Sequence, residues 1–250
     1  MRRFAYAFLL ASTAIAAARP GAASAGKPAP AKAAKPKPGA CPEQSALAAR
    51  LVKQWKLVNN ATVVGVSCTE GKFPAAGWAV VAWIHTPAVA AAAPDAPGAP
   101  EQLEQRLALI TTKGKELAFA VTPRPLSDLA EVRLGTPLVG DLDGDKVDEV
   151  FYPDRNSSQG FQVYALEVWR WADKQLTPLL RRTYASDNDG LVKKDQRVIC
   201  DGSYELVADG KKMTLVLTGT IKKGPKAPAD AAADCTDGTV TLRWQDGKLQ

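Results

Sequence analysis

From residue 62 onward the chain is a succession of short segments in which apolar and polar residues alternate, separated by turn residues. The clearest is "KMTLVLTGTI" (212–221), which places Met213, Leu215 and Leu217 on one face. Alternation with a period of two is typical of a strand that buries one face. Many such strands, joined by hairpin turns, predict a mainly antiparallel β fold.

Two further patterns refine this prediction. The segment "GWAVVAWIHT" (77–86) is apolar on both alternating faces, which indicates a central strand covered on both sides. The segment "CPEQSALAARLVKQWKL" (41–57) has the period of an amphipathic helix, with Pro42 at its first position. Its apolar stripe is expected to contain Leu47, Leu51, Trp55 and Val58. We expect an antiparallel meander or sandwich, or a partial propeller-like domain, with one N-terminal helix. Near the C-terminus we expect two strands, 197–200 and 204–208, on either side of an Asp-Gly turn.

Composition divides the chain into three parts. Residues 1–25 have the charged start, apolar stretch and small-residue cleavage site of a secretory signal peptide. Residues 26–40 form a linker rich in Lys, Pro and Ala, with nothing to bury, and are expected to be disordered. Residues 41–250 are long enough for a single β-rich domain, in which the Pro/Ala-rich stretch 87–102 is expected to be a mobile loop.

The charge distribution argues against a nucleic-acid partner. Seven of the 32 Lys and Arg precede residue 41, whereas all 26 Asp and Glu follow it. The folded part therefore carries 25 basic and 26 acidic side chains, without a basic excess. The only long apolar stretch belongs to the signal peptide, so we expect no transmembrane segment after its cleavage. The partner is expected to be a protein or a glycan.

The four cysteines predict two disulfide bonds and an oxidising compartment. Three pairings are possible. We favour Cys41–Cys68 and Cys200–Cys235, because each closes a short loop within one half of the chain. We therefore expect a secreted or periplasmic protein of a bacterium.

The stretch "VGDLDGDKVDEVFYPD" (139–154) contains five acids within nine positions and suggests a Ca²⁺ site. Hard oxygens from alternate residues, with a glycine at the bend, are what Ca²⁺ requires. Aspartates stand at positions one, three and five, and a glutamate stands at position nine. The expected ligands are Asp141, Asp143, Asp145, the Val147 carbonyl and Glu149.

The same stretch resembles the calcium loops of FG-GAP and VCBS-type repeats, whose pattern is DxDGDGxxD followed by an apolar strand. The resemblance covers residues 139–154 only. It implies the same ligand set and, by analogy of fold, adhesion or ligand binding. Two residues depart from the pattern: Lys146 replaces the second glycine, and Glu149 replaces aspartate at position nine, where Asp148 is the alternative ligand.

No residue pattern indicates a catalytic site, so we assign no catalytic residue. The single histidine, His85, has no signalled nucleophile and is expected to be structural. Most of the six tryptophans are expected in the core rather than on a sugar-stacking face. We favour a non-catalytic binding or structural role for a calcium-stabilised domain. The alternative is a secreted hydrolase that acts on polysaccharide with two carboxylates.

Overall fold

The computed structural model describes residues 40–250 except 90–98, 127, 129–133, 159–160 and 190, and only the backbone of residues 156–158. The predicted signal peptide and residues 26–39 of the predicted linker lie outside the described residues.

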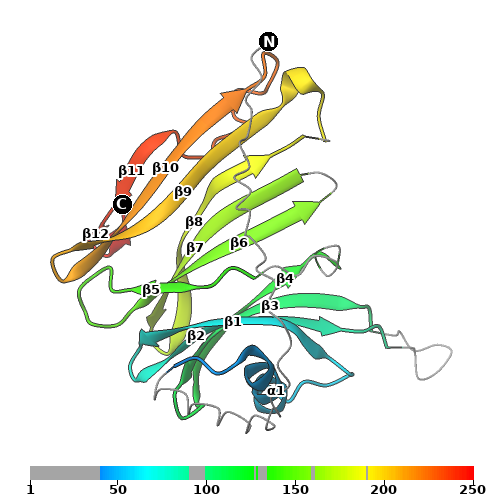
Figure 1. Ribbon diagram of the computed structural model, residues 1–250, viewed down its shortest axis with the longest axis vertical. Coiled ribbons are helices and arrows are strands. Elements are labelled where there is room, and N and C mark those ends of the chain that lie inside the picture. The colour runs from blue at the N-terminus through cyan, green and yellow to red at the C-terminus, as the bar shows by residue number, and fades with distance from the viewer. Residues whose placement is uncertain (1–39, 90–98, 127, 129–133, 159–160, 190) are drawn as a thin grey trace, which may run out of the picture. The chain divides into compact units, whose positions relative to one another are not determined.

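Two antiparallel sheets make up the fold (Figure 1). The first sheet has four strands in chain order: β1 (Thr62–Lys72), β2 (Ala76–Thr86), β3 (Gln102–Thr111) and β4 (Glu116–Arg124). The second has seven, also in chain order: β5 (Leu138–Gly140), β6 (Glu149–Ser158), β7 (Phe161–Ala172), β8 (Gln175–Asp187), β9 (Val198–Asp209), β10 (Lys212–Lys223) and β11 (Gly238–Leu242). A short pair, β12 (Trp244–Gln245) and β13 (Lys248–Leu249), ends the chain. The prediction of a mainly antiparallel β meander or sandwich is confirmed.

The N-terminal helix α1 (Gln44–Gln54) is the one α-helix of the described residues and packs on the first sheet. Leu47 and Leu51 are buried against β1, β2 and β3, as the helical period predicts. The helix is shorter than expected at both ends. Pro42 precedes its N-cap residue, and Val58, beyond its C-terminus, is 68% exposed.

The apolar core between the sheets uses the second face of the first sheet. It joins Phe73 and residues of β2, β3 and β4 to Val150 and Tyr152 of β6 and Leu176 of β8. Strand β2 is therefore covered by α1 on one face and by the second sheet on the other. This arrangement explains why its sequence is apolar at both alternating positions.

The expected Asp201–Gly202 turn is wrong, because β9 continues through these residues. A Cβ atom on Gly202 would lie 2.5 Å from the Thr218 carbonyl oxygen and 2.6 Å from that of Tyr184. Glycine is required here by the close approach of neighbouring backbones, not by a turn.

Both disulfide bonds have the favoured pairing, Cys41–Cys68 and Cys200–Cys235. The first fastens the residues before α1 to β1, and the second fastens the segment before β11 to β9. Each therefore ties an irregular segment to a strand.

The predicted loop 87–102 forms the connection between β2 and β3. Val89 and Ala99 exchange backbone hydrogen bonds of 2.9 and 3.1 Å across it. Residues 90–98, and with them the predicted mobility, lie outside the described residues, and Gln102 already belongs to β3. Within the described part of the chain, no helix combines the length and apolarity needed to cross a membrane.

Candidate metal centre

The acidic loop, residues 141–148, joins β5 to β6 in a hairpin that is closed by the pair Gly140–Glu149. Leu142 is fully buried in the core beneath the second sheet and anchors the loop. The two acids on either side of this anchor, Asp141 and Asp143, are half-buried.

Three of the predicted ligands converge. Carboxylate oxygens of Asp141, Asp143 and Glu149 lie within 4.8 Å of one another. Two oxygens bound to one Ca²⁺ at about 2.3–2.6 Å can be separated by up to roughly 5 Å, so this spacing fits that ion. The group combines the half-buried carboxylates of Asp141 and Asp143 with a third at the start of β6, where Glu149 is only 1% exposed.

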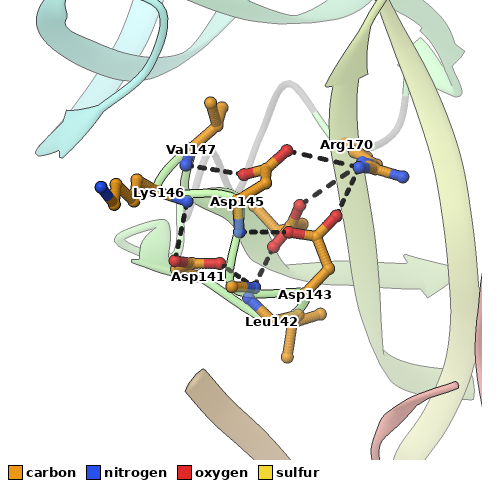
Figure 2. Close-up of polar contacts among 9 residues, drawn as sticks. Asp141, Leu142, Asp143, Asp145, Lys146, Val147 and Arg170 are labelled. Atoms are coloured by element: carbon orange, nitrogen blue, oxygen red, sulfur yellow. Dashed lines mark hydrogen bonds and ion pairs between the residues drawn. The ribbon is translucent and has the colours of Figure 1, made fainter. Parts of the chain in front are cut away.

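Backbone N–H groups organise the loop around these oxygens, as Figure 2 shows for the labelled residues. Asp141 accepts hydrogen bonds from the amides of Gly144 and Lys146, at 2.6 and 3.0 Å. Asp143 accepts one from Asp145, at 3.0 Å. The deeper Glu149 accepts one from Leu142, at 2.7 Å. Such bonds favour the charged form of a carboxylate and hold like charges close together.

The two remaining acids of the loop make different contacts. Asp145 lies outside the group of three and accepts a hydrogen bond from the Val147 amide, at 2.7 Å. Asp148 faces the first sheet, where it accepts a hydrogen bond of 2.6 Å from the Lys72 amide. Between the two alternatives for position nine, the geometry therefore brings Glu149, not Asp148, to the group.

Arg170 of β7 supplies a cation that the loop pattern alone did not predict. Its guanidinium group donates to Asp143 and lies 3.4 Å from Asp145 and 3.7 Å from Glu149 (Figure 2). It also lies over the Trp244 ring, 4.8 Å from the centroid. The sequence carries a signal for it: Arg170 follows the apolar Leu166 and Val168 at spacings of two, as a charge at a position where the alternation predicts an apolar residue.

The bend of the loop uses two residues with left-handed backbones. Gly144 has φ +84° and Lys146 has φ +71°. Lys146 stands where the resembling repeats have their second glycine, so a lysine adopts a conformation that glycine adopts without steric cost.

Burial dominates the electrostatics of the deepest ligand. Desolvation raises the pKa of Glu149 to about 8, against the opposing effect of its hydrogen bond from Leu142. Asp143 raises this pKa further and Arg170 lowers it. Burial also raises the pKa of Asp148.

The acidic loop also connects strands that are distant in the sequence. Its Asp141 carbonyl accepts a hydrogen bond of 2.7 Å from the Met213 amide of β10. Its Asp148 amide donates to the Lys72 carbonyl of β1, at 2.7 Å. The loop therefore touches both sheets, and a change in its order can reach either.

The other singled-out residues have structural partners. His85 lies 2.6 Å from Glu101 at the end of β2. None of the six tryptophans is exposed. Their side chains are buried or pack against the core clusters: Trp55, Trp78, Trp83, Trp169, Trp171 and Trp244.

Two cavities lie away from the acidic loop. One, of about 300 Å³, lies between β7, β8 and residues 230–235, with Arg181 in its wall. The other, of about 340 Å³, has Glu101, Glu104 and Arg124 in its wall. Both glutamates of this second cavity have basic neighbours, at 2.6 and 3.4 Å. Asp230 and Asp234 also lie in the wall of the first cavity, so each cavity has two carboxylates in its lining.

The chain was compared with protein-family models, with curated proteins and with solved structures, and none of them matches it.

Proposed function

We propose that this chain is an exported domain that binds one Ca²⁺ at its acidic loop and has a non-catalytic binding or structural role in the cell envelope or outside the cell. The observation that carries the proposal is the convergence of Asp141, Asp143 and Glu149 within 4.8 Å. Asp145 and the Val147 carbonyl complete the proposed ligand set.

The donor set and its surroundings support Ca²⁺ over other ions. All the proposed ligands are oxygens, which Ca²⁺ prefers, whereas Zn²⁺ sites generally use Cys or His. The one histidine is paired with Glu101, and all four cysteines are in disulfide bonds. Ca²⁺ is also abundant outside cells, where disulfide bonds such as these persist.

Binding requires a local exchange of cations. Arg170 contacts the carboxylates that the ion would use, so the guanidinium must withdraw when Ca²⁺ binds. This competition favours a low affinity, with a dissociation constant on the order of 0.1–1 mM, as in other extracellular modules.

The test is the effect of Ca²⁺ on thermal unfolding. At about 10 mM free Ca²⁺, such an affinity stabilises the fold by about 1–3 kcal/mol. The melting temperature should rise by roughly 3–10 °C for a domain of this size. Asp143→Ala should abolish the increment, because it removes a converging oxygen.

Asp148→Asn is the matched control. It removes a charge from the same loop, but Asp148 faces Lys72 and not the proposed ion. This variant should keep the Ca²⁺ increment whatever its own stability. An equal increment in Asp143→Ala and Asp148→Asn would refute the site.

A further inference from the structure

A second group of charged side chains lies between the two sheets, away from the acidic loop. It contains Arg124 at the end of β4 and Asp128 in the turn that follows. The second sheet contributes Asp154 of β6, Glu167 of β7 and Arg181 of β8. The side chains of Arg124, Asp128 and Asp154 are only 3–4% exposed, so these charges are largely removed from water.

Arg124 is the link between the sheets. Its Nη1 donates to Asp154 Oδ1 at 2.7 Å, and its Nη2 donates to the Arg155 carbonyl oxygen. The guanidinium also lies over the Trp83 ring of β2, 5.0 Å from the centroid. One side chain of the first sheet thus holds β6 of the second by two hydrogen bonds.

Arg181 contacts two carboxylates of the group, Asp154 and Glu167. Its Nε donates to Glu167 at 3.3 Å, and its Nη2 lies 3.6 Å from Asp154 Oδ2. Glu167 also accepts a hydrogen bond from the Trp169 indole, at 3.1 Å. Asp154 and Glu167 therefore each have two donors or cations around them.

Among the described residues, Asp128 has fewer donors and cations around it than Asp154 and Glu167 have. Its one cationic contact in the described part of the chain is Arg124, whose Nη2 lies 3.2 Å from Oδ2 but without the geometry of a hydrogen bond. Within the described members of the group, three carboxyl groups share two guanidinium groups, so these residues, when fully ionised, would bury an uncompensated negative charge. Such a charge is costly, and a carboxyl group in this position takes up a proton instead.

We propose that Asp128 releases its proton at a higher pH than an exposed aspartate does and that this cluster is a pH-sensitive clamp between the two sheets. The clamp binds more tightly when Asp128 is protonated. It weakens when the proton is lost, because burial of the Asp128 charge is costly and Asp154 adds repulsion across Arg124.

The electrostatics of the neighbouring groups agree with this assignment. Burial raises the pKa of Asp128, and the charge of Asp154 raises it further, whereas Arg124 lowers it. Burial and Asp154 also raise the pKa of Glu167, which Trp169 and Arg181 oppose. Two described tyrosines that feel the charge of Asp154, Tyr152 and Tyr184, stay neutral, because burial raises the pKa of each above the usual value.

The sign of the pH dependence follows from linkage. A carboxyl group whose pKa is higher in the folded state favours folding when it is protonated. Its contribution is fully present below the pKa of the unfolded chain and is lost as the pH rises through the folded pKa. Asp128 should therefore stabilise the fold most below the usual aspartate pKa, and this contribution should be lost as the pH rises through its raised pKa.

The test compares Asp128→Asn with the wild-type protein in thermal unfolding from a pH below the usual aspartate range to mildly alkaline pH. Asparagine is neutral and nearly the same size. The melting temperature of the variant should equal that of the wild type in acid and exceed it by a few degrees at alkaline pH. A lower melting temperature at alkaline pH, or a difference that does not change with pH, would overturn the proposal.

Asp187→Asn is the control with the opposite sign. Hydrogen bonds from Arg197 lower the pKa of Asp187, so its charged form favours folding. This variant should be less stable than the wild type at alkaline pH, with the difference vanishing as acid protonates Asp187 in the wild type.

A measurement on the unmutated protein covers the case in which Asp128→Asn does not fold. With ¹³C in the aspartate carboxyl groups, NMR reports the protonation of each aspartate. The Asp128 resonance should titrate above the range of exposed aspartates, together with a chemical-shift change at the Arg155 amide. An Asp128 resonance that titrates at or below the usual aspartate range would contradict the proposal.

Discussion

At the scale of single residues, Arg170 decides the charge balance of the acidic loop. It contacts three of the four carboxylates that face the loop, while the fourth, Asp141, is held by backbone amides. The loop therefore has an internal counter-ion in the absence of metal. Crowding of acids alone does not require a bound cation, and the Ca²⁺ proposal depends instead on whether the ion can displace this guanidinium.

Arg170→Gln should separate the two cations. In Ca²⁺-free solution the variant should lose about 1–3 kcal/mol of unfolding free energy, because the carboxylates lose their partner; the range allows for the partial exposure of Arg170. The stabilisation by Ca²⁺ should be larger than in the wild type, because nothing competes with the ion. Chemical denaturation with and without Ca²⁺ measures both quantities.

Arg243→Gln is the control for this prediction. Arg243 pairs with Asp209 at 3.5 Å, and both side chains are more than half exposed. Its removal should change stability by less than about 1 kcal/mol and leave the Ca²⁺ increment unchanged. An unchanged Ca²⁺ increment in Arg170→Gln would show that the two cations do not share a site.

The left-handed backbone of Lys146 gives a second prediction at this scale. Lys146→Gly should stabilise the fold by about 0.5–1 kcal/mol, because the strain of a side chain at φ +71° exceeds the entropy cost of glycine. Lys146→Ala removes the same charge but keeps Cβ, and should show no such gain. Denaturant titration of both variants checks the prediction, and equal effects would assign the change to the charge instead of the backbone.

At the scale of elements, the buried apolar stripe of α1 ends before Val58. Leu51→Ala should cost about 2–5 kcal/mol, because this side chain is fully buried beneath α1. Val58→Ala should cost less than about 0.5 kcal/mol, because Val58 lies beyond the helix and is mostly exposed. Unfolding free energies that fall equally in the two variants would contradict the position of the helix end.

This contrast illustrates what the sequence could predict about the elements. Periodicity identified the helix, the strand β2 that is covered on both faces, and the alternating strand β10. A buried face requires apolar side chains at regular spacings, so it can be recognised in the sequence. The helix end and the course of β9 were not predictable in this way. The backbones that approach Gly202 belong to Thr218 and Tyr184, so their effect becomes visible only in three dimensions.

The same distinction applies to the candidate metal site. Spacing along the chain identified Asp141, Asp143 and Glu149, because they belong to one local turn. It could not show that Asp148 faces Lys72 or that Arg170 reaches the loop, since these contacts depend on strand packing. The inter-sheet clamp was missed for the same reason.

At the scale of the whole molecule, the acidic loop connects strands of both sheets. Through backbone and carboxylate hydrogen bonds it holds the amides of Lys72 in β1 and Met213 in β10. A bound ion that orders the loop should therefore act on both sheets at once. This is how a local site could stabilise the entire domain.

Hydrogen exchange tests this coupling. Ca²⁺ should slow exchange of the Lys72, Leu142 and Met213 amides, all of which bond to the acidic loop or lie within it. The Val89 and Ala99 amides, which bond to each other, are the reference for protection that is independent of the loop. Protection confined to the loop, without Lys72 and Met213, would limit the ion to a local effect.

The most direct measurement is a crystal structure of the protein grown in saturating Ca²⁺. The account predicts an ion bound by Asp141, Asp143 and Glu149 at about 2.3–2.6 Å, with the Arg170 guanidinium turned away from Asp143. A loop without an ion under these conditions, with Arg170 still bonded to Asp143, would contradict it.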